Sequence, residues 1–377
     1  MIDRLIDTDI IPLLLLAALG VAFLIQMVYY WGVFWRLGRT LKNKDTSDKP
    51  GVSVVICAHN EYRHLKESLP LYLEQDYPEY EVVVVNHASD DDTQFLLNTL
   101  QLQYPHLKSL TIQEDLNFFS GKKFPLSIGI KSAKYEILLL TDADCIPSSK
   151  NWVGLMQSAY SAGVEIVLGY GPYNRLSGFV NKLIRFDTVH IATQYLSFAV
   201  AGFPYMGVGR NLSYVKSLFY RNNGFISHYR LHSGDDDLFI NRVATRRNTA
   251  IMTLPGSYTF SAPKLTMGKW ITQKKRHLST ATHYRPVHKI LLGLYSISLV
   301  LFYTGTILLL SLNISVFAVA AIFLLRLITQ YLVFTRCMHK LDEKDLIPFV
   351  PVFEILLLLL NSGSMISNLF RKPVRWK

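Results

Sequence analysis

The stretch E-I-L-L-L-T-D-A-D, residues 136–144, joins a run of large apolar side chains to two carboxylates two positions apart, Asp142 and Asp144. Such a run is typical of a strand that is buried on both faces of a sheet. Carboxylates directly after the strand lie at the end of the sheet where parallel α/β folds bind ligands. Because Mg²⁺ and Mn²⁺ take oxygen ligands and share them with phosphates, the pair is a candidate divalent-cation site. The alternative is an Asp-rich turn that caps the next helix.

The surrounding sequence predicts an α/β domain with a mostly parallel, doubly wound sheet, because apolar β-branched runs alternate with amphipathic stretches. Strands are expected at Val52–Ala58, Glu81–Asn86, Ser109–Gln113, Glu136–Thr141 and Glu165–Tyr170. Helices are expected at Glu61–Gln75, Thr93–Gln103, Lys123–Lys134, Asn151–Ala162, Gly178–Phe198, Tyr214–Asn222 and Leu238–Arg247. Polar clusters follow the first, second and fourth strands, which makes those strand ends the expected ligand site.

Two long stretches, 10–35 and 290–325, contain no Asp, Glu, Lys or Arg. The chain is 50% apolar and only 18% charged, which excludes an ordinary soluble protein. Since about 20 apolar helical residues cross a bilayer, the stretches predict membrane segments on either side of one large domain. The expected organisation is an N-terminal anchor (1–36), the α/β domain (37–262), a basic interfacial segment (263–289), a membrane region with two spans plus a third span or re-entrant segment (290–370), and a basic tail (371–377).

The net charge of +11 is concentrated beside the apolar runs. Seven basic and no acidic residues lie between 263 and 289, a pattern typical of a cytoplasmic membrane surface and not of a nucleic-acid groove. The rule that positive charge stays inside predicts a multi-pass protein of the cytoplasmic (inner) membrane, with the large domain and the tail in the cytoplasm. The three cysteines have no metal-site spacing, so a disulfide framework is not expected.

Five motifs in the same order resemble the membrane-bound family-two glycosyltransferases of the GT-A type, in the branch of cellulose-synthase-like and poly-N-acetylglucosamine-synthase-like enzymes. The motifs are Val52–Glu61, Ser120–Leu126, Thr141–Asp144, Ser233–Leu238 and Gln273–His277. The resemblance implies that a divalent cation, Mg²⁺ or Mn²⁺, is bound by Asp144 together with Asp142.

The resemblance also implies a role for each matched residue. Residues that would bind the nucleotide-diphospho-sugar are Ala58, Asn60, Glu61, Asn86, Asp91, Lys122 and Asp142. Gln273 and Arg276 would bind the diphosphate, and the catalytic base would be Asp235, with Asp236 as the alternative.

The sequence departs from the family pattern at three places. Gly234 stands where the family's acceptor motif has a Glu. Asn86-His87 replaces a pair of Asp residues, so recognition of the nucleotide base is expected to rest on Asn86 or Asp91. His277 replaces a Trp that long-chain synthases use at the acceptor site. The last change favours transfer of one or a few sugars over polymer synthesis.

The sequence therefore predicts an inverting hexosyl- or N-acetylhexosaminyltransferase at the cytoplasmic face of a membrane. Its donor would be a nucleotide-diphospho-sugar, with a UDP-sugar favoured, and its acceptor a lipid or lipid-linked saccharide. Two alternatives remain, which are a processive polysaccharide synthase and a catalytically silent membrane scaffold of an envelope assembly complex.

Overall fold

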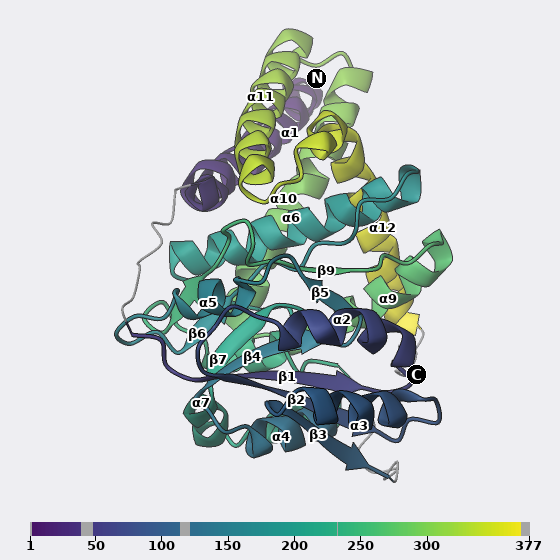
Figure 1. Ribbon diagram of the computed structural model, residues 1–377. Helices are drawn as coiled ribbons and strands as arrows, with labels where there is room; N and C mark the ends of the chain where they lie inside the picture. Colours follow the sequence, from purple (N-terminus) through teal and green to yellow (C-terminus); the bar gives the residue numbers. More distant parts are fainter. Residues whose placement is uncertain (1, 39–47, 114–120, 232, 371–377) are drawn as a thin grey trace.

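A computed structural model describes residues 2–38, 48–113, 121–231 and 233–370. A mixed sheet with helices on both faces forms the α/β domain, and a helical bundle stands at one side of it (Figure 1). The predicted tail, 371–377, and Ser120 of the second motif lie outside the described residues.

The main sheet has seven strands in the order β3-β2-β1-β4-β7-β6-β8. Its strands are β1 Val52–Ala58, β2 Tyr80–His87, β3 Leu107–Ile112, β4 Ile137–Asp142, β6 Ile166–Leu168, β7 Leu212–Val215 and β8 Thr249–Ile251. The first four pair in parallel, whereas β7 runs antiparallel to both β4 and β6. A small second sheet pairs β5 Cys145–Pro147 with β9 Thr259–Ser261. The expectation of a mostly parallel α/β sheet is confirmed.

Helices cover both faces of the sheet. They are α2 Tyr62–Leu73, α3 Thr93–Gln103, α4 Lys123–Ser132, α5 Trp152–Gln157, α6 Phe179–Ala201, α7 Lys216–Arg221, α8 Asp237–Val243 and α9 Met267–Thr280. Along β1, Val54 belongs to the core under α2 and Val55 to the core under α4 and α6, so the strand is apolar on both sides as its sequence predicts. A Cβ on Gly129 of α4 would lie 2.6 Å from Val55 Cγ1, which shows how closely α4 approaches the sheet.

The structure corrects several predicted elements. The helix expected at 214–222 is wrong at its start, because Tyr214 belongs to strand β7 and α7 begins at Lys216. Tyr214 is fully buried, packs 5.0 Å from Phe239 and lies between two hydrogen-bonded strands, so tertiary pairing overrides the local pattern. Helix α5 ends at Gln157 and not at residue 162. Strands β5, β8 and β9, which were not predicted, have three residues each. They are too short to show the alternation of apolar and polar residues that indicates a strand.

The bundle contains four helical segments that are long and apolar enough to cross a membrane, by length and composition, at 10–38, 286–311, 316–340 and 344–368. They comprise α1 Ile2–Met27 with the π-helix Val28–Val33 and the 3₁₀ turn Phe34–Gly38, then α10 Pro286–Ser311, α11 Val316–Lys340, the 3₁₀ segment Lys344–Phe349 and α12 Val350–Phe370.

A buried ion pair joins these helices. Arg326 of α11 donates to Glu354 of α12 at 2.6 Å, and also to Gln26, Tyr30 and Tyr303 on the other segments. One segment thus carries the guanidinium and the other three contact it, which explains how two charged side chains are accommodated among apolar helices.

Helix α12 ends beside the α/β domain. Near its C-terminal end, Ser367 Oγ accepts a hydrogen bond from Lys275 of α9 at 2.9 Å, and Asn368 donates to the Lys275 carbonyl at 2.9 Å. Figure 1 shows α12 running from the bundle down to α9 along the edge of the domain. The final segment is therefore one continuous helix after a short 3₁₀ segment.

Candidate active site

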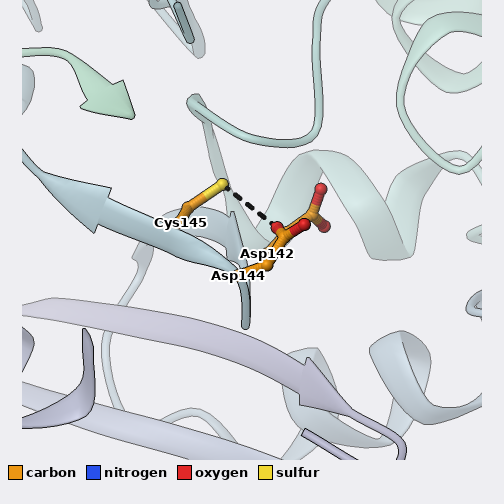
Figure 2. Close-up of side chains that lie close together, drawn as sticks. All are labelled: Asp142, Asp144 and Cys145. Atoms are coloured by element: carbon orange, nitrogen blue, oxygen red, sulfur yellow. Dashed lines mark hydrogen bonds between the residues drawn. The ribbon is translucent and has the colours of Figure 1, made fainter. Parts of the chain in front are cut away.

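Two carboxylates and a thiol gather where β4 ends. Ligand atoms of Asp142, Asp144 and Cys145 all lie within 4.8 Å of one another, and the Cys145 thiol donates to Asp144 Oδ1 at 3.6 Å (Figure 2). Burial raises the pKa of the Cys145 thiol well above its usual value, so the thiol stays protonated at neutral pH and is a poor metal ligand. The two carboxylates remain as the oxygen ligands that a hard divalent cation prefers.

Asp142 and Asp144 have different electrostatic surroundings. Lys122, which precedes α4, forms an ion pair with Asp142 Oδ1. Although burial acts in the opposite direction, the Lys122 ammonium lowers the pKa of Asp142. Burial and the adjacent negative charge of Asp142 raise the pKa of Asp144. A bound cation would relieve the repulsion between the two carboxylates, so this donor set fits a divalent metal ion.

Arg210 is a further cation at the site, and its position beside the carboxylate pair was not predicted from the sequence. Its guanidinium stacks 4.3 Å over the Tyr173 ring and donates to Ser261 at 2.8 Å. Its charge acts on both carboxylates of the pair. Arg210 lies two positions before β7. Because the sequence predicted a helix from Tyr214 and no strand at β7, it did not place Arg210 next to β4. The sequence signal would have been a basic residue directly before an antiparallel strand next to β4.

The three consecutive Asp residues of the motif Ser233–Leu238 have different hydrogen-bond partners. Asp236 caps α8, because its Oδ1 accepts from the Asp237 backbone N–H at 2.7 Å and its Oδ2 from the Gly209 N–H at 2.7 Å. Asp237 points the other way and accepts from the hydroxyl groups of Thr280 and Tyr284. These two side chains are therefore engaged in holding the fold.

Asp235 differs from both neighbours. Within the described part of the chain, no other residue donates a hydrogen bond to its carboxylate, and the charges of Lys122 and Asp142 act on it. Burial and the charge of Asp236 raise the pKa of Asp235. Gly234 has φ +98°, a conformation that a Glu would adopt only under strain, so the change from the family pattern has a backbone cause.

Helix α9 presents the last predicted pair. Gln273 donates to the Tyr173 hydroxyl at 3.3 Å, and its Oε1 is buried with no partner among the described residues. Arg276 lies one turn further on the same face, and its charge contributes to the lowered pKa of Asp142. Lys274 between them turns away and pairs with Asp187 of α6 at 2.6 Å.

The ends of β1 and β2 form an open cleft of about 600 Å³. Asn60 has φ +58°, and its Oδ1 accepts from the Asp90 N–H at 2.8 Å. Asp91 accepts from the backbone N–H groups of Tyr62 and Thr93, both at 3.0 Å. The predicted residues Asn60 and Asp91 therefore brace the two strand-end loops against each other along the wall of the cleft.

The other predicted donor residues lie around the same strand ends. Ala58 is the last residue of β1, and Glu61 pairs with His64 at 2.5 Å. Asn86 is buried at the end of β2, where it donates to Gln94 at 2.8 Å and leaves its Oδ1 without a partner among the described residues.

Comparison with known proteins gives a consistent result. A poly-beta-1,6-N-acetyl-D-glucosamine synthase of Staphylococcus epidermidis is 28% identical over 133 residues, which are 34% of this chain and 30% of that protein. The glycosyltransferase AglE of Haloferax volcanii is 32% identical over 127 residues, 33% of this chain and 40% of that protein. The chain thus spans less than half the length of these curated relatives.

One solved structure shares the fold over most of its length. The mannosyltransferase PcManGT from Pyrobaculum calidifontis, solved in complex with GDP-Man and Mn²⁺, superposes with a TM-score of 0.58 over 92% of this chain and 98% of that one, at 19% identity. Residues 53–213 match the family model described as Glycosyl transferase family 2. This match covers β1 to the middle of β7, with the Asp142–Asp144 pair inside it, so residues 53–213 are similar to family 2 glycosyltransferases and the chain shares the fold of the mannosyltransferase.

Proposed function

We propose that this chain is a membrane-anchored, metal-dependent, inverting glycosyltransferase. It would transfer a hexosyl or N-acetylhexosaminyl group from a nucleotide-diphospho-sugar to a lipid or lipid-linked saccharide. The observation that carries the proposal is the convergence of Asp144, Asp142, three cations and the Asp235 carboxylate, to which no other described residue donates a hydrogen bond, at the carboxyl end of β4.

The cations suit the leaving group. Lys122, Arg210 and Arg276 all act on Asp142, and so lie where a nucleoside diphosphate would develop negative charge. Asp144, with Asp142, would hold Mg²⁺ or Mn²⁺, and the ion would neutralise part of that charge. The guanidinium groups can bind phosphate oxygens in a bidentate manner.

Asp235 is the proposed base. An inverting transfer needs one group that takes the proton from the acceptor hydroxyl as that hydroxyl attacks the sugar. A carboxylate that accepts no hydrogen bond from another described residue and whose pKa is raised meets this need, and Asp235 has both properties. Asp236 is less suitable because both of its oxygens already accept backbone hydrogen bonds.

A groove near the membrane bundle supports a lipid acceptor. It has a volume of about 280 Å³ and lies between the start of α6 and the segment that leads to α9. Leu265 is 78% exposed and Phe179 54% exposed on its rim, and the Phe179 ring also packs 5.5 Å from Phe353 of α12. Lys264 lines the groove and its charge acts on Asp144. Apolar side chains leading from a membrane helix toward the site suit an acceptor with an apolar chain.

We further propose that the domain faces the cytoplasm at the inner membrane. The basic segment 263–289 supports this orientation because cytoplasmic loops carry an excess of Lys and Arg. Helix α12 ends beside α9, which supports a tail on the same side as the domain. A UDP-sugar is the favoured donor.

The test uses full-length protein purified in detergent. Release of nucleoside diphosphate from a panel of UDP- and GDP-sugars is measured with and without Mn²⁺, alongside Asp144→Asn and the exposed control Glu67→Gln on α2. We expect one donor to be hydrolysed slowly, with metal only, by the wild type and the control but not by Asp144→Asn. Metal-independent turnover, or an active Asp144→Asn variant, would contradict the metal role. Failure of every donor to bind would favour a catalytically silent scaffold.

A further inference from the structure

A buried lysine at the start of α4 holds the segment that leads to the proposed base. Lys123 is only 3% exposed, and its ammonium donates to three backbone carbonyls. The acceptors are those of His228 at 3.1 Å, Leu231, and Ser233 at 2.6 Å. All three N–H donors of the ammonium are therefore used. The three acceptor carbonyls belong to one short segment of the chain, which surrounds the charge. We call the described residues 228–231 and 233 the acceptor loop.

Such an arrangement is unusual for a lysine, which normally keeps its charge in water. Burial lowers the pKa of Lys123, and the carboxylate charge of Asp235 opposes that change. Carbonyl oxygens at hydrogen-bond distance compensate for the lost water, so removing the ammonium would leave three buried acceptors without their donor. The acceptor loop consequently depends on this side chain for its conformation.

The consecutive residues Lys122 and Lys123 bind different halves of the site. Lys122 pairs with Asp142 on the donor side, while Lys123 binds the acceptor loop. Lys122 directly precedes α4 and Lys123 is its first residue. The helix packs closely on the sheet because Gly129 allows contact with Val55. The start of α4 therefore links the carboxylate pair and the acceptor loop through one rigid element.

We propose that Lys123 is a positioning residue for Asp235. By holding the carbonyls up to Ser233, it fixes the point from which Gly234 turns and so directs the Asp235 carboxylate toward the donor. This inference rests on the proposed function of Asp235. A displacement of about 1 Å in a reacting group can reduce the rate about 100-fold, so loss of the tether should reduce turnover by roughly that factor.

The kinetic test compares Lys123→Met, which keeps the length of the side chain but no donor, with Lys123→Arg, which keeps charge and donors. Lys131→Met, an exposed lysine on the same helix, is the matched control. In Lys123→Met we expect kcat for sugar transfer to fall about 100-fold, with the KM for the nucleotide-sugar unchanged. Lys123→Arg should recover part of the loss, and the control should match the wild type.

A second measurement does not need activity. Amide hydrogen exchange of residues 226–231 in the full-length protein should be faster in Lys123→Met than in the wild type and Lys131→Met, while β1 stays equally protected in all three. Equal protection of 226–231, or a donor KM that rises as much as kcat falls, would overturn the proposal. So would an arginine variant no better than the methionine variant. If the wild type transfers no sugar, the proposed function fails, whereas the exchange result still decides whether Lys123 tethers the loop.

Discussion

Replacing Asp235 and Asp236 one at a time should separate catalysis from folding. Asp235→Asn removes the proposed base and no hydrogen bond from another described residue, so kcat should fall by about 10²–10⁴, or roughly 3–5 kcal/mol of barrier, while the thermal midpoint should not fall. Asp236→Asn leaves one of two backbone N–H groups, those of Gly209 and Asp237, facing an amide NH₂. Loss of that bond should destabilise the protein by about 1–3 kcal/mol and change kcat less than tenfold.

The pH profile makes the same test sharper. Burial and then the charge of Asp236 raise the pKa of Asp235, and the base must be deprotonated, so kcat falls as the pH drops below that pKa. Removing the charge of Asp236 lowers this pKa, and the acid limb should move to lower pH in Asp236→Asn. The assay is nucleotide release against pH with saturating donor and acceptor. An Asp235→Asn variant with wild-type kcat, or an acid limb that does not move in Asp236→Asn, would refute the assignment.

Three other predictions concern metal, membrane and pH. Asp144→Asn should abolish the Mn²⁺-dependent part of donor binding, measured by titration calorimetry, and retained metal dependence would exclude that role. Glu354→Gln leaves Arg326 buried without its counter-charge and should cost about 3–5 kcal/mol of stability, with a smaller fall in thermal midpoint when Arg326→Met is added. Burial raises the pKa of Asp237 from 3.8 to about 7, so the folded protein retains a proton that the unfolded chain releases, and stability falls as pH rises between these values. The thermal midpoint should decrease from pH 5 to pH 8, and less in Asp237→Asn; equal slopes would contradict the assignment.

The sequence was most informative where a residue's position follows from period and length. Strand β1 was predicted with its correct bounds, and Asp142 was placed at the end of its strand, because a strand buried on both faces has a continuous apolar sequence. The positions of the candidate metal pair and of the candidate donor loops then follow from the rule that ligands bind at the carboxyl ends of strands. None of this requires knowledge of a distant contact.

Side-chain direction at a loop–helix junction does require it. The sequence alone does not distinguish three consecutive Asp residues. Asp235 differs from its neighbours because Gly234 has a positive φ and because the N–H of Gly209, 27 positions before Asp236, is donated to Asp236. Arg210 was missed because β7 is only four residues long and depends on two neighbouring strands. Such short elements are determined by pairing, which a local pattern does not contain.

The side chains of α9 that we propose to bind phosphate are positioned from two directions. Lys274 anchors the helix to α6 through Asp187, and Lys275 anchors it to α12 through Ser367. Gln273 and Arg276 occupy the remaining face, toward the carboxylate pair. Because α12 is itself tied to the bundle by a buried ion pair, the helices of the bundle also support the candidate site structurally. An α/β domain cut free of them would therefore lose one of the two contacts that orient Gln273 and Arg276, even if its sheet stayed folded.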